Sequence, residues 1–151
     1  GFYVGFPAMA IGGARRVLDE FEKHTAGRVR FSGVNEKDSP TSQRVLAKLK
    51  MEMLTAESLM TEYIQMMERD KGGPYEGAKY KVIRATIIEK CTEIGVRALL
   101  TLGGHALLKG HPVELFSRDL IAIATHITSL YEDGLIGYGR HLFGVQTNIQ
   151  G

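Results

Sequence analysis

Apolar residues recur in alternating steps of three and four between residues 46 and 67, and this spacing restricts the fold more than any other feature of the sequence. The positions are Leu46, Leu49, Met53, Ala56, Met60, Tyr63 and Met67. Such steps place side chains along one stripe of an α-helix, as in helices that pack nearly antiparallel. Ser39-Pro40 before the stripe is a favourable helix start, and Gly72-Gly73-Pro74 after it breaks a helix. We therefore expect one long helix here.

Three other segments carry the same signature. In segment 2–25 the apolar positions are Phe6, Met9, Ala10, Gly13, Val17 and Phe21. In segment 76–108 they are Ile83, Ile87, Cys91, Ile94 and Ala98. A fourth helix is expected to begin at Pro112 or Val113 and to continue through LIAIATHITSLYEDGLIGYGRHLFG. Strand patterns are nearly absent, so the sequence predicts an all-α protein, an up-down four-helix bundle that forms a single domain over residues 1–151.

Composition and charge exclude several classes of protein. The chain has 151 residues, 44% of them hydrophobic and 24% charged, as is typical of one globular domain. No apolar run approaches the roughly 20 residues that span a bilayer, so we expect no membrane segment. The net charge of +2 comes without a basic stripe, which argues against nucleic-acid binding. A single cysteine, Cys91, and the lack of a secretory signal fit a cytoplasmic protein without an internal disulfide.

Two polar residues stand in the apolar register of the fourth predicted helix. Asp119 and His126 are seven residues apart, which places them on one face about 10 Å apart by helix rise. On a structural interpretation, Asp119 caps or pairs with a neighbouring helix and His126 is a satisfied interior histidine. On a functional interpretation, His126, flanked by the small residues Ala122 and Ser129, faces a ligand and acts as a general acid or base.

The other histidines give no metal site. His105 and His111 flank the turn before the fourth helix, but no cysteine or paired carboxylate stands at ligand spacing, so we expect no metal. His141, near the end of the chain, is interpreted as a cation at a helix C-terminus.

The stretch GGHALLKGHPVELFSRD, residues 103–119, resembles the late signature of the acyl-CoA dehydrogenase superfamily. In that signature a Gly-Gly at the end of one helix precedes a Pro-x-Glu and an Arg-Asp on the next. The matching positions are Gly103, Gly104, Pro112, Glu114, Arg118 and Asp119. Upstream, Arg28 and Phe31 match the family's Arg-x-x-Phe element, and Gln43 matches the start of its second helix. The resemblance thus covers nearly the whole chain.

By this resemblance the chain is the C-terminal helical bundle of a longer flavoenzyme, and its first residues, GFYVGFPAMAIGGARR, read as the interior of a longer protein. In the family this bundle builds a homotetramer, and the Arg-x-x-Phe and Gly-Gly elements approach a flavin, FAD or FMN, across a subunit boundary. The resemblance implies five cofactor contacts: Arg28, Phe31, Gln43, Gly103 and Gly104. Simpler interpretations are a solvated charge for Arg28, a core side chain for Phe31 and a helix-packing notch for the two glycines.

The sequence departs from the acyl-CoA dehydrogenases themselves at two places. Leu115 stands where the family usually has Arg, and the Glu-Gly-Thr turn that follows Arg-Asp is missing, since Glu132 lies too far along. Both departures argue against dehydrogenation of an acyl-CoA. The chain is more similar to the flavin-dependent monooxygenases of this fold, such as p-hydroxyphenylacetate hydroxylase and dibenzothiophene monooxygenase. In that branch a His follows the Arg after eight residues, as His126 follows Arg118.

That similarity implies His126 as the catalytic residue, which helps to deprotonate a phenolic or similar substrate or hydrogen-bonds to the reactive flavin. Arg118, Asp119 and Ser129 would support the site. The expected reaction is hydroxylation of a small aromatic substrate by O2 and a reduced flavin that a separate reductase supplies, and the fragment alone is expected to be inactive. Two alternatives stay open: an acyl-CoA dehydrogenase or oxidase, and a non-catalytic helical module for oligomerisation.

Overall fold

The computed structural model describes residues 2–71, 77–108, 110–126 and 130–145, and these ranges are mostly helical. The helices are α1 (Phe2–Gly27), α2 (Pro40–Arg69), α3 (Gly77–Leu102), α4 (Pro112–Ala124) and α5 (Tyr131–Leu142). Two short 3-10 helices are η1 (Glu36–Asp38) and η2 (Gly103–Leu107). Extended pairing in these ranges is limited to an isolated antiparallel bridge between Val29 and Asn35. The predicted all-α class is confirmed.

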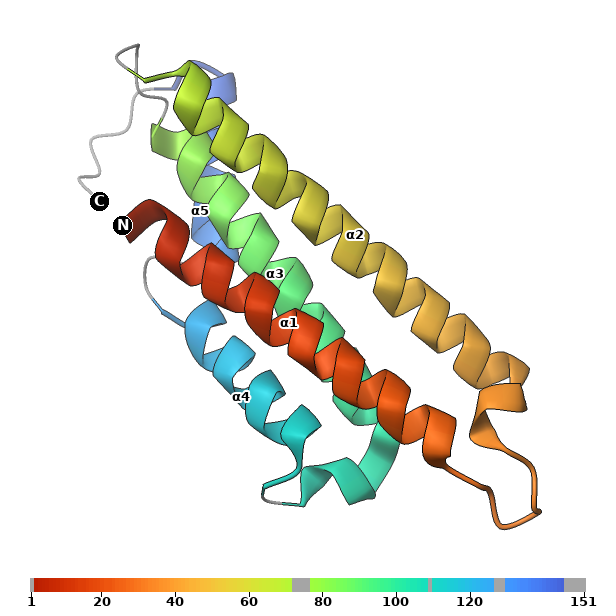
Figure 1. The fold of residues 1–151 in the computed structure, drawn as a ribbon. Helices are drawn as coiled ribbons and strands as arrows, with labels where there is room; N and C mark the ends of the chain where they lie inside the picture. The colour runs from red at the N-terminus through yellow and green to blue at the C-terminus, as the bar shows by residue number, and fades with distance from the viewer. Residues whose placement is uncertain (1, 72–76, 109, 127–129, 146–151) are drawn as a thin grey trace.

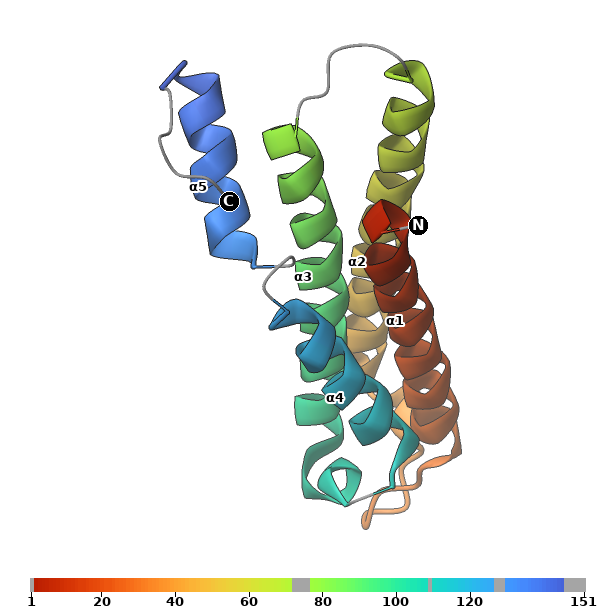
Figure 2. The ribbon, with the colours of Figure 1, turned by 90° about the vertical axis from the view of Figure 1, so that its left-hand side faces the viewer.

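Successive long helices alternate in direction along the bundle (Figures 1 and 2). The fourth position is shared by two helices: α4 packs on α1 and α3, and α5 continues in the same direction and packs on α3. The predicted up-down four-helix bundle is therefore confirmed, with its fourth helix in two pieces. Within the described part of the chain, no helix combines the length and hydropathy of a membrane span.

The predicted apolar stripes form the core. Buried members are Ala10, Val17, Phe21, Leu49, Met53, Ala56, Tyr63, Ile87, Cys91, Ile94 and Ala98. Partly buried members that pack against them are Phe6, Leu46, Met60, Met67 and Ile83. One position was wrong: Met9 is 59% exposed, because it lies about 100° round the helix from the stripe through Ala10.

Small residues let α4 approach α1 and α3 closely. A Cβ on Gly13 of α1 would stand 3.3 Å from Leu120 Cδ2, and a Cβ on Gly95 of α3 would stand 3.0 Å from Leu120 Cδ1. Ser117 Oγ, buried on α4, donates a hydrogen bond to the carbonyl oxygen of Gly95. Gly13 thus marks a close helix approach, as small residues at this point of the sequence suggest, whereas Gly12 faces open space.

Two predicted helices end earlier than their apolar periodicity indicates. α3 stops at Leu102 because Gly103 adopts a left-handed conformation with φ +74°, which favours glycine. The fourth helix does not run on, since α4 ends at Ala124 and the N–H of His126 donates to the carbonyl of Ile123 in a tight last turn. The β-branched residues in the following sequence THIT lower helix propensity, and an apolar period does not register that effect.

Candidate functional site

The segment between α1 and α2 contains Arg28, a predicted cofactor contact, and is shaped by its own backbone. The N–H of Arg30 donates to the carbonyl of Val34 at 2.8 Å, and the N–H of Glu36 donates to the carbonyl of Arg28 at 2.9 Å. The isolated antiparallel bridge lies between these two bonds. We refer to residues 28–36 as the hairpin loop.

Side chains brace the hairpin loop. Arg30 and Glu36 form a bidentate pair, in which Arg30 Nε donates to Oε2 at 2.7 Å and Nη2 donates to Oε1 at 3.0 Å. Arg30 Nη2 also donates to Ser39 Oγ at 2.9 Å, and Ser42 Oγ on α2 donates to Glu36 Oε1. The hydrogen bond from Arg30, followed by that from Ser42, lowers the pKa of Glu36 to about 2. These four residues, the Glu36 network, tie the loop to the first turn of α2.

Phe31 stands on the hairpin loop with its ring in solvent. Its exposed fraction is 114%, so the interpretation of Phe31 as a core side chain is wrong. The reason is that the loop turns away from the bundle, and Arg28 in the same loop is exposed as well. An aromatic ring held in this way is available to stack on a planar group, and an exposed guanidinium is available to pair with an anion.

Three further predicted contacts lie at the same end of the bundle. Gln43 Nε2, in the first turn of α2, donates to the carbonyl of Lys37 at 3.0 Å, so this side chain also helps to hold the connection after the hairpin loop. No described atom lies within 4 Å of a Cβ built on Gly103 or Gly104. The interpretation of these two glycines as a helix-packing notch is therefore wrong within one chain. Figure 1 shows η2, which contains both glycines, at the end of the bundle where the hairpin loop lies.

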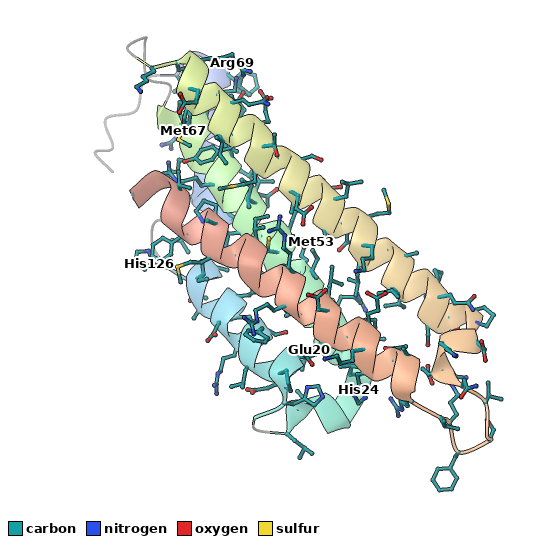
Figure 3. All side chains as sticks on the ribbon, in the orientation of Figure 1. Glu20, His24, Met53, Met67, Arg69 and His126 are labelled. Atoms are coloured by element: carbon teal, nitrogen blue, oxygen red, sulfur yellow. The ribbon has the colours of Figure 1, made fainter. Side chains whose placement is uncertain are left out.

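His126 lies toward the other end of the bundle. In Figure 3 it is well separated from His24, which marks the last turns of α1. The His126 ring stands 4.9 Å from the ring of Phe6, near the start of α1, at an interplanar angle of 43°. From Phe6 to Arg28 the chain advances about 30 Å by helix rise. A single chain therefore does not bring His126 together with the predicted cofactor contacts.

The expectation that Asp119 and His126 share a buried register is wrong, because both are exposed. The buried face of α4 lies about 100° round the helix from Asp119, and the helix ends before His126. Asp119 forms no ion pair among the described residues. Arg118 pairs with Glu114 one turn earlier on α4, at 3.6 Å. Ser129, the third predicted supporting residue, lies outside the described residues.

The structure adds contacts that sequence reasoning missed. His111 caps α4, since its Nδ1 accepts from the N–H of Val113 at 3.2 Å, and its ring meets His24 edge-on at 5.6 Å. The sequence signal for this cap was the following proline, which favours the first turn of a helix. For the Glu36 network, the signal was a pair of opposite charges six residues apart around Gly33. In the described part of the chain, no group of three His, Cys, Asp or Glu side chains is placed to hold a metal ion.

A groove of about 260 Å³ lies between α1 and α2, away from the predicted site. Its lining residues are Arg15, Leu18, Asp19, Lys50, Met53, Leu54 and Glu57. An ion pair from Arg15 Nε to Glu57 Oε1, at 2.8 Å, joins the two helices there. None of the predicted site residues lines this groove. Of the predicted cofactor contacts, Arg28, Phe31, Gln43 and Gly104 are exposed and Gly103 is partly exposed.

Comparison with known proteins gives the same architecture. A 3-HSA hydroxylase from Rhodococcus sp. RHA1 matches 97% of the chain, with a TM-score of 0.83 and 19% identity, and the matched part is 39% of that protein. XiaF from Streptomyces sp. matches 99% of the chain, with a TM-score of 0.87 and 14% identity, and the matched part is again 39% of that protein.

The fold is shared with a dehydrogenase as well. A glutaryl-CoA dehydrogenase from Mycobacterium smegmatis matches 97% of the chain with a TM-score of 0.81 and 20% identity, and the chain spans 37% of it. No curated protein sequence matches significantly. Residues 4–130 match the family described as acyl-CoA dehydrogenase, C-terminal domain. The chain therefore belongs to the family of acyl-CoA dehydrogenase C-terminal domains.

Proposed function

We propose that the chain is the C-terminal helical domain of a longer flavin-dependent oxidoreductase, and that the end with the hairpin loop contacts FAD or FMN. The observation that carries this proposal is the exposure of Arg28 and Phe31 on a braced loop, at the same end of the bundle as the exposed Gly104. Similar structures support it, since the XiaF structure and one glutaryl-CoA dehydrogenase structure are complexes with FADH2.

The chemistry of these residues suits a flavin nucleotide. The Arg28 guanidinium can donate two hydrogen bonds to a phosphate, and the Phe31 ring can stack on a planar ring. Gly104 has no side chain to keep a ligand from its backbone. A bound flavin would supply the redox chemistry, while these residues would hold and orient it.

Within the described residues of one copy, the predicted flavin contacts and His126 do not meet. The predicted flavin contacts on the hairpin loop are separated from His126 by about 30 Å, judged by helix rise along α1. The groove between α1 and α2 contains none of these residues. We infer that a complete site takes the hairpin-loop end from one copy and His126 from another, within a homotetramer. Domains upstream of this bundle would form the rest of the pocket.

The favoured reaction is hydroxylation of a small aromatic substrate, such as a phenol, with O2 and a reduced flavin from a separate reductase. His126 is exposed beside Phe6, so its imidazole is accessible to a substrate hydroxyl. A neutral imidazole can accept the phenolic proton, which makes the ring more electron-rich for oxygen transfer. Arg118, paired with Glu114, and Asp119 would support the position of α4.

The break between α4 and α5 favours a second candidate, dehydrogenation of an acyl-CoA. The sequence argued against it partly because the fourth helix was expected to continue where the dehydrogenases have a turn. α4 ends at Ala124, six residues after Arg118, so this objection is weaker than the sequence suggested. The similarity to a glutaryl-CoA dehydrogenase supports the same candidate at the level of fold.

The test uses the full-length natural protein. It is mixed with reduced FAD or FMN and isotopically labelled O2 in the presence of a panel of phenols, and incorporation of label into the product supports the monooxygenase. Loss of colour of bound oxidised flavin on adding an acyl-CoA, without a reductase, supports the dehydrogenase instead. A full-length protein that binds no flavin overturns both and leaves an oligomerisation module.

A further inference from the structure

We propose that Glu36 is a positioning residue, which holds the hairpin loop in the shape that presents Arg28 and Phe31 to the flavin. The inference rests on the proposed function, because Glu36 acts on the flavin contact only through the loop. It assigns a role to a residue that no feature of the family resemblance singles out.

Glu36 is the centre of the polar contacts of the loop. Its carboxylate accepts two hydrogen bonds from Arg30 on the opposite limb of the hairpin and one from Ser42 on α2. Its side chain is 16% exposed, against 45% for that of Arg30, so the carboxylate is largely enclosed by its partners. Charge-assisted, bidentate hydrogen bonds are stronger and more directional than neutral ones. One carboxylate therefore joins both limbs of the hairpin to the helix that follows.

The hairpin loop has little apolar packing of its own. Its three large apolar side chains are all exposed, with fractions of 59% for Val29, 114% for Phe31 and 46% for Val34. A two-stranded hairpin without an apolar face is marginally stable in water. The Glu36 carboxylate takes the place of the packing that the loop lacks.

A braced loop binds a ligand at lower entropic cost than a loop that must order on binding. Replacing the Glu36 carboxylate by an amide removes its charge but none of the atoms that would meet the flavin. Glu36→Gln is therefore expected to loosen the loop and to weaken flavin binding, while the helical core keeps its stability.

The experiment compares wild type, Glu36→Gln and Asp38→Asn in the full-length protein. Asp38 is the matched control, because it is exposed, lies two residues further on and undergoes the same carboxylate-to-amide change. Hydrogen exchange is followed by mass spectrometry in the peptide that contains the hydrogen-bonded amides of Arg30, Gly33 and Glu36. Binding of FAD and of FMN is titrated in parallel.

In Glu36→Gln we expect exchange of these loop amides to be about tenfold faster and the flavin dissociation constant to be about tenfold higher, as for loss of a hydrogen bond to a charged group. Asp38→Asn should change neither, and the melting temperature of the core should match wild type in both variants. Arg30→Gln should also speed loop exchange and weaken flavin binding, and the effect of the double variant should be smaller than the sum of the two single effects, because both changes remove the shared Arg30–Glu36 pair.

Two results would overturn the inference. Unchanged loop exchange in Glu36→Gln means that the carboxylate does not hold the loop, whatever happens to flavin binding. Faster exchange with unchanged flavin affinity means that the flavin does not need the braced loop. A wild-type protein that binds no flavin contradicts the proposed function and the positioning role together, while the exchange measurement still decides whether Glu36 braces the loop.

Discussion

Ser117 Oγ on α4 donates a hydrogen bond of 3.0 Å to the carbonyl oxygen of Gly95 on α3, where the two helices meet at close range. A Cβ on Gly95 would stand 3.1 Å from Ser117 Oγ and 3.4 Å from Ser117 Cα. The Cα belongs to the backbone, so it cannot rotate out of the way. The absence of a side chain at position 95 therefore sets the spacing between α3 and α4.

Gly95→Ala is expected to destabilise the protein by about 1–3 kcal/mol, because the added methyl group overpacks this contact. The matched control is Gly12→Ala on α1, where a Cβ meets open space. That change is expected to stabilise the helix by about 0.5–1 kcal/mol. Urea denaturation measures both, and equal stability of Gly95→Ala and wild type would contradict the close approach.

Phe31→Ala should leave the stability within about 0.5 kcal/mol of wild type, since the ring makes no buried contact in one chain. Phe21→Ala, at a residue 1% exposed on α1, should cost about 3–5 kcal/mol. Flavin binding is expected to separate the two roles: the Phe31→Ala variant should lose affinity for flavin although it stays folded. A large drop in the melting temperature of Phe31→Ala would show that its ring is buried.

Glu89 on α3 is expected to destabilise the fold when ionised. Burial first, and then the charges of Glu93 and Glu132, raise its pKa. The penalty is present at neutral pH and disappears as the pH falls below the unfolded value of about 4.3. Glu89→Gln should therefore stabilise the protein at pH 7 by about 0.2–0.5 kcal/mol, the usual size of an i,i+4 like-charge repulsion.

The control for Glu89 is Glu68→Gln on α2, an exposed position. It should change stability little at either pH. The comparison is made by urea denaturation at about pH 7 and about pH 4, on either side of the titration of a glutamate. A Glu89→Gln variant that is less stable than wild type at neutral pH would contradict the sign of the effect.

Glu36 should behave in the opposite way with pH. Its pKa of about 2 is depressed mainly by the hydrogen bond from Arg30, so its stabilisation is complete above the unfolded value and is lost as the pH falls toward 2. The difference in protection of the loop amides between wild type and Glu36→Gln should therefore shrink as the pH is lowered from about 5 to about 3, on the linkage argument. Hydrogen exchange of the amides of Arg30, Gly33 and Glu36, corrected for the intrinsic pH dependence of exchange, provides the measurement. A difference that grows on acidification would contradict this prediction.

His126→Gln tests the catalytic assignment. Because His126 is exposed, the substitution should leave the melting temperature unchanged, while product formation by the full-length protein should fall by about 10²–10⁴-fold, as for loss of a general base. His141→Gln, at an exposed position in the last turn of α5, is the control and should keep full activity. Equal activity of both variants would remove His126 from the reaction.

Periodicity predicted the parts of the fold that packing decides. The stripes through Leu49 and Ile87 are buried as expected, because apolar residues at helical spacing share one face of the helix, which packs against the core. The end of α4 was not predicted, because the apolar period continues through a stretch whose backbone preference is against a helix. At that point the apolar period, which reflects packing, favours a helix, whereas the local backbone preference disfavours one. The sequence pattern reports only the first of these.

The candidate site was predictable only in part. The family resemblance picked out Arg28 and Phe31, and the structure presents both at the surface. It did not pick out Glu36, whose partners Arg30 and Ser42 come together only when the hairpin loop folds back on α2. Hydrogen bonds between residues of different limbs carry no period, so a linear pattern does not reveal them.

Arg28 follows the end of α1 whereas His126 lies beside Phe6 at its start, and this separation has a consequence for how the protein responds to dilution. Under the proposed arrangement each complete site draws on two copies of the chain, so the number of sites follows the law of mass action. Activity per chain would then decline once the protein is diluted below the dissociation constant of its assembly. A mixture of one copy that lacks Arg28 and another that lacks His126 would still contain intact sites.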